Sequence, residues 1–242
     1  MEWRDEGILL SAKPHGETSA IVDVLTAHHG RHAGIVRGGV SRRLTPVLQP
    51  GNQVSVEWRA RLEEHLGTFT VDLIKSRSTV LQDRGRLAAL ASFCAVSAYA
   101  LPERFNLPQL YATSLEMVDH LEMSPDWGAY YALWELALLD ELGFGLDLAA
   151  CAATGAEDDL IYVSPKSGRA VSGGAGAEYA DRMLPLPGFF RGEPFADMSD
   201  VAAALTTTGF FLTKHLAGQV VGRPLPGARD RMVVAISRLI GT

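Results

Sequence analysis

The feature that most constrains the fold is a change of sequence pattern near Val80. Before it, five short segments are rich in Val, Ile, Leu and Thr, and several of them alternate apolar with polar residues. Turn-forming pairs such as Gly38-Gly39 and Pro50-Gly51 separate these segments, so they are predicted to be β-strands. The five predicted strands are Gly7–Pro14, Ser19–Ala27, Arg31–Gly39, Asn52–Ala60 and Gly67–Ser76. Strands of this number and length predict a small closed barrel, a class that includes the oligonucleotide-binding (OB) barrels.

After residue 80, Ala and Leu recur at helical spacing, and prolines bound the segments. Five helices are predicted, over residues 81–103, 107–123, 126–144, 200–218 and 229–241. A segment rich in Gly and Pro, residues 151–194, interrupts them and contains a possible hairpin over 160–172. The predicted fold class is therefore α+β. A five-stranded barrel domain (1–80) is followed by a helical bundle domain (81–242) that carries this insertion.

Composition narrows the class of protein. The 242 residues are 47% hydrophobic and include two cysteines, Cys94 and Cys151, which excludes a disulfide framework and points to a reducing compartment. The acidic N-terminus does not resemble a signal peptide. The longest apolar-rich run, Leu87–Leu101, is shorter than the roughly 20 residues that span a bilayer. We therefore expect a cytoplasmic protein without a membrane partner.

Charge is distributed unevenly along the chain. The net charge is -6, yet residues 1–80 contain ten basic and nine acidic side chains, and no carboxylate lies between Asp23 and Glu57. Nucleic-acid phosphates are bound by Lys and Arg and repelled by carboxylates, so a basic face on the barrel would suit them. Trp58, Phe69 and His32 are candidate platforms for stacking bases. The alternative is an ordinary solvated face, and the residues alone favour neither interpretation.

Motifs for catalysis or metal binding are absent from the sequence. It contains no phosphate-binding loop of the G-x-x-x-x-G-K-[ST] type, no H-E-x-x-H and no G-x-S-x-G. The glycine-rich stretch at Gly173 is interpreted as a flexible loop, and the histidines near His28 as a surface turn. The residues therefore give no support to an enzyme, although a site that motifs do not reveal would remain possible.

Three stretches of the chain, in order, resemble the RecO family of bacterial recombination mediators. The first includes Gly16–Ser19, Thr26, Gly30, Arg37–Arg43 and Leu48–Gly51; the others are Trp134–Gly155 and His215–Arg229. The resemblance implies an OB barrel and a non-enzymatic function in DNA repair, associated with the nucleoid. Such proteins bind single- and double-stranded DNA, anneal complementary strands and pair with RecR. They also dock on the C-terminal tail of single-strand DNA-binding protein and so help, indirectly, to load RecA.

The resemblance also implies site residues. Phosphate contacts would come from Arg31, Arg37, Arg42 and Arg43, with Lys13, Arg59, Lys75 and Arg77 as further candidates. The partner tail would bind an apolar pocket flanked by basic groups, with candidates Trp134, Leu138, Lys214, Arg223 and Arg229. Leu133 stands where the family usually has an arginine, which leaves the basic partner to Lys214, Arg223 or Arg229. For Trp134, Leu138, Phe210 and Phe211 taken singly, core packing is the favoured alternative.

Some members of the family carry two C-x2-C pairs that bind zinc. This chain keeps Cys151, but Thr154 replaces the second cysteine and the second pair is missing, so we predict no metal and no other cofactor. Cys151 is then expected to be buried or half-buried, with residues 151–194 ordered by packing alone or mobile. The competing functional hypothesis is a protein–protein adaptor whose barrel is a scaffold that binds no nucleic acid.

Overall fold

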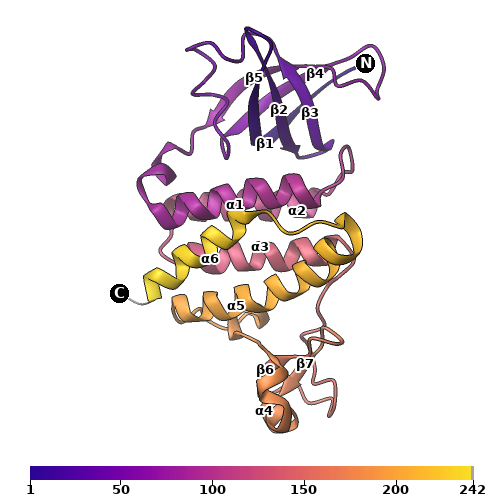
Figure 1. Cartoon of the computed structure of the whole chain (residues 1–242), viewed down its shortest axis with the longest axis vertical. Helices are drawn as coiled ribbons and strands as arrows, with labels where there is room; N and C mark the ends of the chain where they lie inside the picture. The colour runs from indigo at the N-terminus through magenta and orange to yellow at the C-terminus, as the bar shows by residue number, and fades with distance from the viewer. Residues whose placement is uncertain (241–242) are drawn as a thin grey trace. The chain divides into compact units, whose positions relative to one another are not determined.

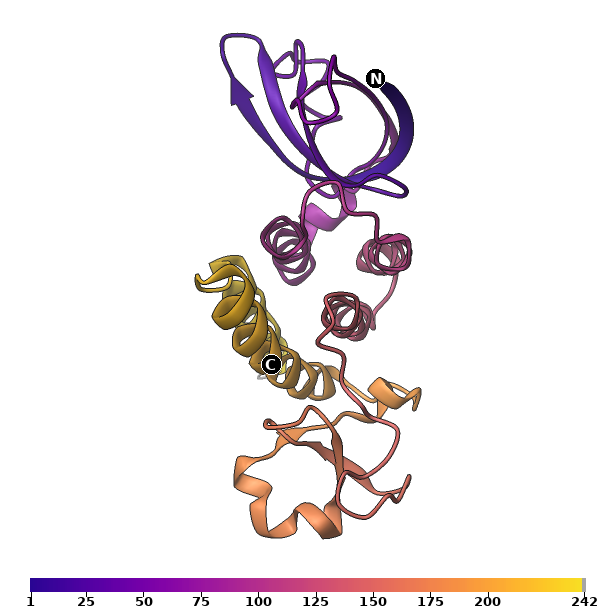
Figure 2. The ribbon, with the colours of Figure 1, turned by 90° about the vertical axis from the view of Figure 1, so that its right-hand side faces the viewer.

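A computed structural model describes residues 1–240. The chain divides into two compact units, one from Met1 to Glu122 and one that starts at Met123. The five predicted strands are present as β1 (Glu2–His15), β2 (Ser19–Thr26), β3 (Gly30–Val36), β4 (Gln53–Arg59) and β5 (Thr68–Lys75). They form a barrel in the order β1-β2-β3-β5-β4 (Figures 1 and 2). The predicted OB-type barrel is thus confirmed.

The long strand β1 holds the barrel together because it pairs with both β2 and β4. The remaining closure, between β3 and β5, is a short parallel pairing of Ile35 with Thr68 and of Val36 with Phe69. Inward-facing side chains fill the barrel at every second position; Val22, Val24, Val54 and Val56 are among the buried ones. The barrel is therefore rigid in its core and weakly joined along the β3–β5 seam.

The first unit also contains two helices, α1 (Arg84–Ala100) and α2 (Pro108–Met123), after a short 3₁₀ turn at Ser78–Gln82. The Asp83 side chain caps α1 by accepting a hydrogen bond from the backbone N–H of Arg86. Strands thus give way to helices close to residue 80, while the compact unit extends to Glu122. The domain boundary predicted at residues 80 and 81 stays a prediction.

The second unit is built from α3 (Trp127–Glu141), α5 (Met198–Phe211) and α6 (Gly227–Ile240), together with a small sheet. That sheet has the order β7-β6-β8, with β6 at Leu160–Val163, β7 at Ala170–Ser172 and β8 at Leu184–Pro185. The hairpin predicted over residues 160–172 is therefore present. Gly241, the last residue of the fifth predicted helix, lies outside the described residues.

Two details of the second unit differ from the sequence-based expectations. The helix predicted over 200–218 is α-helical only to Phe211 and continues as a π-helix, Leu212–Val221. The glycine-rich stretch expected to be a loop forms a short helix, α4 (Gly173–Gly176). Residue spacing gave no signal for either change. Among residues 1–240, no helix is long and apolar enough to cross a membrane.

Hydrogen bonds around Cys151 order the start of the segment 151–194. The Cys151 Sγ atom is buried and accepts hydrogen bonds from the backbone N–H of Ser172 at 3.3 Å and from the Ser172 hydroxyl at 3.5 Å. Hydrogen bonds from Ser172 and Thr154 lower the pKa of Cys151 to about 6. The two donors of Ser172 thus tie the start of this segment to β7.

Candidate nucleic-acid interface

Three of the predicted arginines lie on the loop after β3. The side chains of Arg37, Arg42 and Arg43 are exposed and make no ion pair or hydrogen bond with any residue from 1 to 240. The loop itself is well anchored, because Leu48 is buried in the barrel and Asn52 donates hydrogen bonds to the carbonyls of Pro46 and Val47, both at 3.0 Å. Free cationic groups on a rigid support are suited to phosphate binding.

A groove beside this loop brings several predicted residues together. It has a volume of about 470 Å³ and is lined by Val36, Arg37, Arg43, Leu44, Val47, Arg59 and the β5 residues Thr68–Leu73. We call it the β5 groove. Asp72 is its one carboxylate, against three arginines. The rim is therefore basic, and polar groups make up most of the exposed lining.

Arg59 is less available to a ligand than the loop arginines, and Lys13 lies apart from them on β1. The guanidinium of Arg59 forms ion pairs with Glu57 and, at 3.0 Å, with Glu2, although 60% of the side chain remains exposed. Lys13 lies on β1, is exposed, and acts electrostatically on Asp23. Both side chains could reach a ligand, but the charge of Arg59 is already largely balanced.

Arg31 has a structural position in the first unit. Its side chain is 15% exposed, lies 2.6 Å from Asp23 and donates a hydrogen bond through Nε to the carbonyl of Leu101 at 2.9 Å. Burial raises the pKa of Asp23 in spite of the neighbouring Arg31 charge. Arg31 thus fastens β3 to the segment after α1 and has little freedom to contact phosphates.

Arg77 and Lys75 are engaged in a second ion-pair network. The Arg77 side chain is 1% exposed and lies 2.5 Å from Asp119 and 2.8 Å from Glu122, while Lys75 lies 2.6 Å from Asp119. Burial opposes ionisation of Asp119, yet hydrogen bonds from Lys75 and Arg77 outweigh it and lower the pKa. Arg77 therefore joins the end of β5 to α2.

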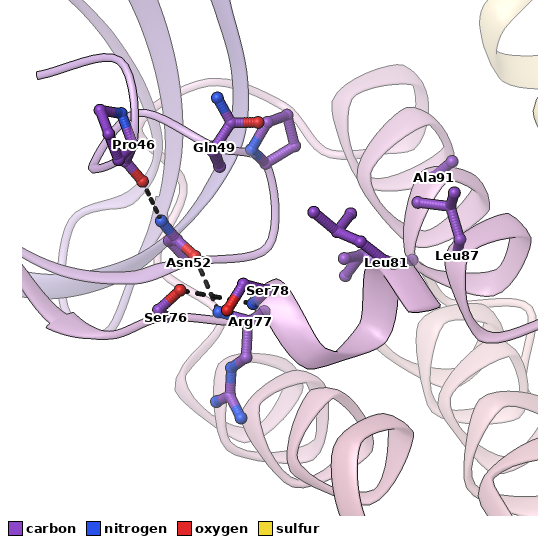
Figure 3. A pocket seen from close by; sticks show the side chains of 11 residues that line it. Pro46, Gln49, Asn52, Ser76, Arg77, Ser78, Leu81, Leu87 and Ala91 are labelled. Carbon is purple, nitrogen blue, oxygen red and sulfur yellow. Dashed lines mark hydrogen bonds between the residues drawn. The ribbon is translucent and has the colours of Figure 1, made fainter. Parts of the chain in front are cut away.

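An apolar pocket of about 330 Å³ lies next to Arg77. Its apolar wall comes from Leu81, Leu87 and Ala91. Figure 3 shows the Arg77 side chain pointing away from these residues, while Asn52 accepts a hydrogen bond from the Arg77 backbone N–H at 2.9 Å. The charge of Arg77 is therefore directed away from this pocket.

The prediction that Trp58, Phe69 and His32 serve as stacking platforms is wrong. Their exposed fractions are 1%, 4% and 3%, because all three side chains point into the barrel. The Trp58 indole N–H donates to the carbonyl of Leu66 at 3.1 Å. Among the Phe, Tyr and Trp residues of the first unit, Phe105 is the most open to solvent, at 59% exposed, and sequence pattern gave no signal for it.

Of the predicted partner-binding residues, some line a pocket of the second unit and others are buried in its core. A pocket of about 800 Å³ between α5 and α6 is lined by Leu205, Phe210, Lys214, Arg229, Val233 and Val234, among others. Trp134 and Leu138 do not line it, because both are completely buried on α3, as the core-packing alternative expects. Arg223 is exposed but lies outside the lining. Lys214 donates to the carbonyl of Pro165 at 2.8 Å.

Arg229 forms a buried ion pair that links the helices of the second unit. It lies 2.7 Å from Oε1 of Glu135 on α3 and donates to Oε2 at 2.8 Å. Glu135 also accepts a hydrogen bond from the Thr208 hydroxyl at 2.6 Å. Burial disfavours the charged form of Arg229, but the Glu135 carboxylate more than compensates, so the pKa is raised. Gly209 is needed here, since a Cβ atom would lie 2.6 Å from Arg229.

Comparison with known proteins identifies the family. The model described as "Recombination protein O N terminal" matches residues 1–77, and the one described as "Recombination protein O C terminal" matches residues 81–224. The chain belongs to the RecO family. The gap between the two RecO matches coincides with the change from strands to helices, and the second match spans helices of both compact units.

Relatives named DNA repair protein RecO match over nearly the whole chain. One from Ruegeria sp. is 52% identical over 241 residues, covering 99% of this chain and 100% of the relative. Another from Cereibacter sphaeroides is 51% identical over 238 residues, covering 98% of this chain and 100% of the relative. A third, from Roseobacter denitrificans, is 50% identical over 239 residues and covers 98% and 99%. The chain is therefore a DNA repair protein of the RecO family.

Proposed function

We propose that the chain is a recombination mediator whose barrel binds DNA through Arg37, Arg42 and Arg43. The observation that carries this proposal is the set of three exposed arginines, without acidic partners among residues 1–240, on the anchored loop beside the β5 groove. In the first unit most other arginines are held by carboxylates or carbonyls. The loop is thus the place where cationic charge is available to a polyanion.

The remaining predicted contacts take different parts in this proposal. Arg31 and Arg77 hold the first unit together and do not touch DNA, because their side chains are 15% and 1% exposed and paired with carboxylates. Arg59, Lys75 and Lys13 are secondary contacts. Arg59 and Lys75 must first exchange a carboxylate for a phosphate, at little net gain.

The buried aromatic side chains shape the proposed mode of binding. Without an exposed ring in the β5 groove, the barrel would hold the phosphate backbone and leave the bases free to stack or pair. This mode accepts both single- and double-stranded DNA. It also suits annealing, since neutralising the phosphates of two complementary strands removes their repulsion while their bases remain available.

The second unit would serve protein partners. The pocket between α5 and α6 combines apolar Phe210, Val233 and Val234 with the cationic group of Lys214, while the Arg229 charge is taken up by Glu135. We propose that it takes the acidic, apolar-ended tail of single-strand DNA-binding protein. Together with RecR, this docking would place the chain on coated single strands and help to load RecA. No step of this function requires bond chemistry.

The test is fluorescence anisotropy of a labelled single-stranded oligonucleotide at several salt concentrations. The triple variant Arg37→Gln, Arg42→Gln, Arg43→Gln should bind more weakly, and its salt slope should fall by about 2, at roughly 0.7 per phosphate contact. The matched control is Arg84→Gln, Arg182→Gln, Arg231→Gln, which removes the same charge from exposed sites elsewhere. If the wild type does not bind even at low salt, the adaptor hypothesis replaces this one.

A further inference from the structure

One edge of β5 is open. The strand pairs with β4 along its length, from Thr68 to Lys75, but it pairs with β3 only through Thr68 and Phe69. Beyond Phe69 no strand or isolated bridge within residues 1–240 pairs with this edge. The chain leaves β3 after Val36 and turns into the loop that carries Arg37, Arg42 and Arg43, which we call the arginine loop. An open edge presents backbone groups that can pair with another strand.

The β5 groove runs along this open edge. Successive side chains of a strand point to opposite faces of the sheet, so a groove over one face would be lined by alternate residues. The β5 groove is lined by six consecutive residues, Thr68–Leu73. It therefore follows the edge itself, with Leu44 and Val47 of the neighbouring loop as its opposite wall.

The orientation of the backbone groups can also be assigned. Ile35 donates a hydrogen bond to the carbonyl of Gly67 at 3.1 Å, so Gly67 presents its backbone groups toward β3. N–H and C=O groups of a strand residue point to the same side, and the side alternates along the strand. Phe69 presents its groups to β3 in the same way, so Val71 and Leu73 present their N–H and C=O groups to the open edge, and Thr70 and Asp72 present theirs to β4.

The chemistry of the groove selects the strand that could be added there. Arg37 and Arg43 stand at its rim without acidic partners among residues 1–240, and Asp72 is its one carboxylate. Leu73 and Ile74, at 42% and 45% exposed, offer apolar contact near its end. A second copy of this chain would bring two arginine-lined rims together, which charge repulsion disfavours. A strand that alternates acidic with apolar residues would both pair with the arginines at the rim and pack on the exposed apolar side chains.

We infer that the β5 groove binds an extended acidic peptide of a protein partner, which adds to β5 as a further strand. Hydrogen bonds to Val71 and Leu73 fix its register, and Arg37 and Arg43 pair with its carboxylates. This is β-strand addition, in which main-chain hydrogen bonds supply affinity and side-chain contacts supply specificity. The inference does not rest on the proposed DNA binding, although both ligands would meet the same two arginines and therefore compete.

The test uses the full chain and two fluorescent peptides of about eight residues, long enough to cover the open edge. Both alternate valine with aspartate or glutamate. The second is identical in charge but N-methylated at alternate residues, so that it cannot donate hydrogen bonds to β5. The protein variants are Leu73→Pro, which removes an N–H that faces the groove, and Leu73→Ala, which removes only the side chain. Anisotropy is read with each peptide and with the DNA oligonucleotide.

We expect the unmodified peptide to bind at least roughly ten-fold more tightly than its N-methylated twin. Leu73→Pro should weaken peptide binding more than Leu73→Ala does, while DNA affinity stays within about two-fold. Equal binding of the two peptides, or binding of neither, would overturn the inference. Because the two peptides are compared on the wild-type protein, this comparison remains decisive even if Leu73→Pro fails to fold. A concentration-dependent dimer that Leu73→Pro abolishes would overturn it too, since a second copy would then occupy the edge.

Discussion

Two groups of arginines in this protein have the same chemistry and opposite environments. Arg37, Arg42 and Arg43 extend from a loop into solvent without acidic partners among the described residues, whereas Arg31, Arg77 and Arg229 are nearly buried and each is paired with a carboxylate. The difference shows that an arginine's position in the sequence says less about its role than the carboxylates that the fold brings to it.

The contrast has a physical basis. Removing a guanidinium from water is costly, so a buried arginine persists only where carboxylates and carbonyls compensate it. Such an arginine has no charge to offer a ligand. An exposed arginine contributes little to folding because its interactions are screened, and its charge remains available. Stability and ligand binding should therefore separate cleanly between the two groups.

The largest effect is expected at the Arg229–Glu135 pair. Arg229→Met should lower the free energy of unfolding by about 3 to 5 kcal/mol, because it leaves the Glu135 carboxylate buried without its cation. Chemical denaturation followed by circular dichroism measures this change. Arg231→Met, an exposed change on the same helix, should alter stability by less than about 0.5 kcal/mol.

Removing both charges provides the sharper version of this experiment. The double variant Arg229→Met, Glu135→Gln should recover part of the loss, since an uncharged pair needs no compensation. If the loss in free energy of unfolding of the double variant equals the sum of the losses for Arg229→Met and Glu135→Gln, the two residues do not act as a pair. The distinction between buried and exposed arginines would then concern packing and not charge.

His32 extends the comparison to a basic group that is buried and, among the described residues, has no carboxylate hydrogen-bonded to it. Burial, with smaller contributions from Arg104 and His29, lowers its pKa from 6.5 to about 4. As the pH falls below 6.5, His32 therefore binds a proton in the unfolded chain but stays neutral in the folded chain until about pH 4. The stability that is present above pH 6.5 is consequently lost as the pH falls. Between pH 7 and pH 5 the loss should be about 2 kcal/mol.

Unfolding curves at several pH values test this expectation. The same curves for His32→Leu serve as the control, since that variant has no imidazole to protonate. The difference between the two proteins isolates the contribution of His32 from all other titrating groups. If both proteins lose stability in parallel, His32 keeps its ordinary pKa and the barrel interior tolerates its charge.

Arg31 and Arg37 lie on and just after the same strand and provide a direct comparison. Arg31→Gln should lower the free energy of unfolding by about 1.5 kcal/mol, because it removes the ion pair with Asp23, and should leave DNA affinity nearly unchanged. Arg37→Gln should lower DNA affinity and leave the free energy of unfolding nearly unchanged. Paired measurements of unfolding and of oligonucleotide anisotropy check both. A loss of DNA affinity in Arg31→Gln at unchanged stability would contradict the assignment.

The sequence was sufficient to predict the barrel, because strand alternation and turn residues are local signals. The helices of the second unit were predicted for the same reason. It was not sufficient to separate Arg31 from Arg37, since the partners of Arg31, Asp23 and Leu101, come from other parts of the chain. The stacking role assigned to Trp58 failed because alternation also places that side chain inside the barrel. Long-range pairing decides which charges are free.

The smallest expected effect is at Asp72, the one carboxylate of the β5 groove. Asp72→Asn removes a charge that repels phosphates at a solvent-exposed site, where Coulomb energies are weak and screened by salt. DNA affinity should rise by about two- to three-fold at low salt, and the gain should vanish as salt is added. Titrations at matched salt concentrations measure it.

The control for this prediction is Asp181→Asn, which removes the same charge at an exposed position of the second unit. Change in net charge alone would raise affinity equally in both variants, whereas a local effect would appear only at Asp72. An equal rise would mean that DNA contacts the arginine loop without entering the groove. In that case the groove would be left to the acidic strand, and the two ligands would share the arginines but not the β5 edge.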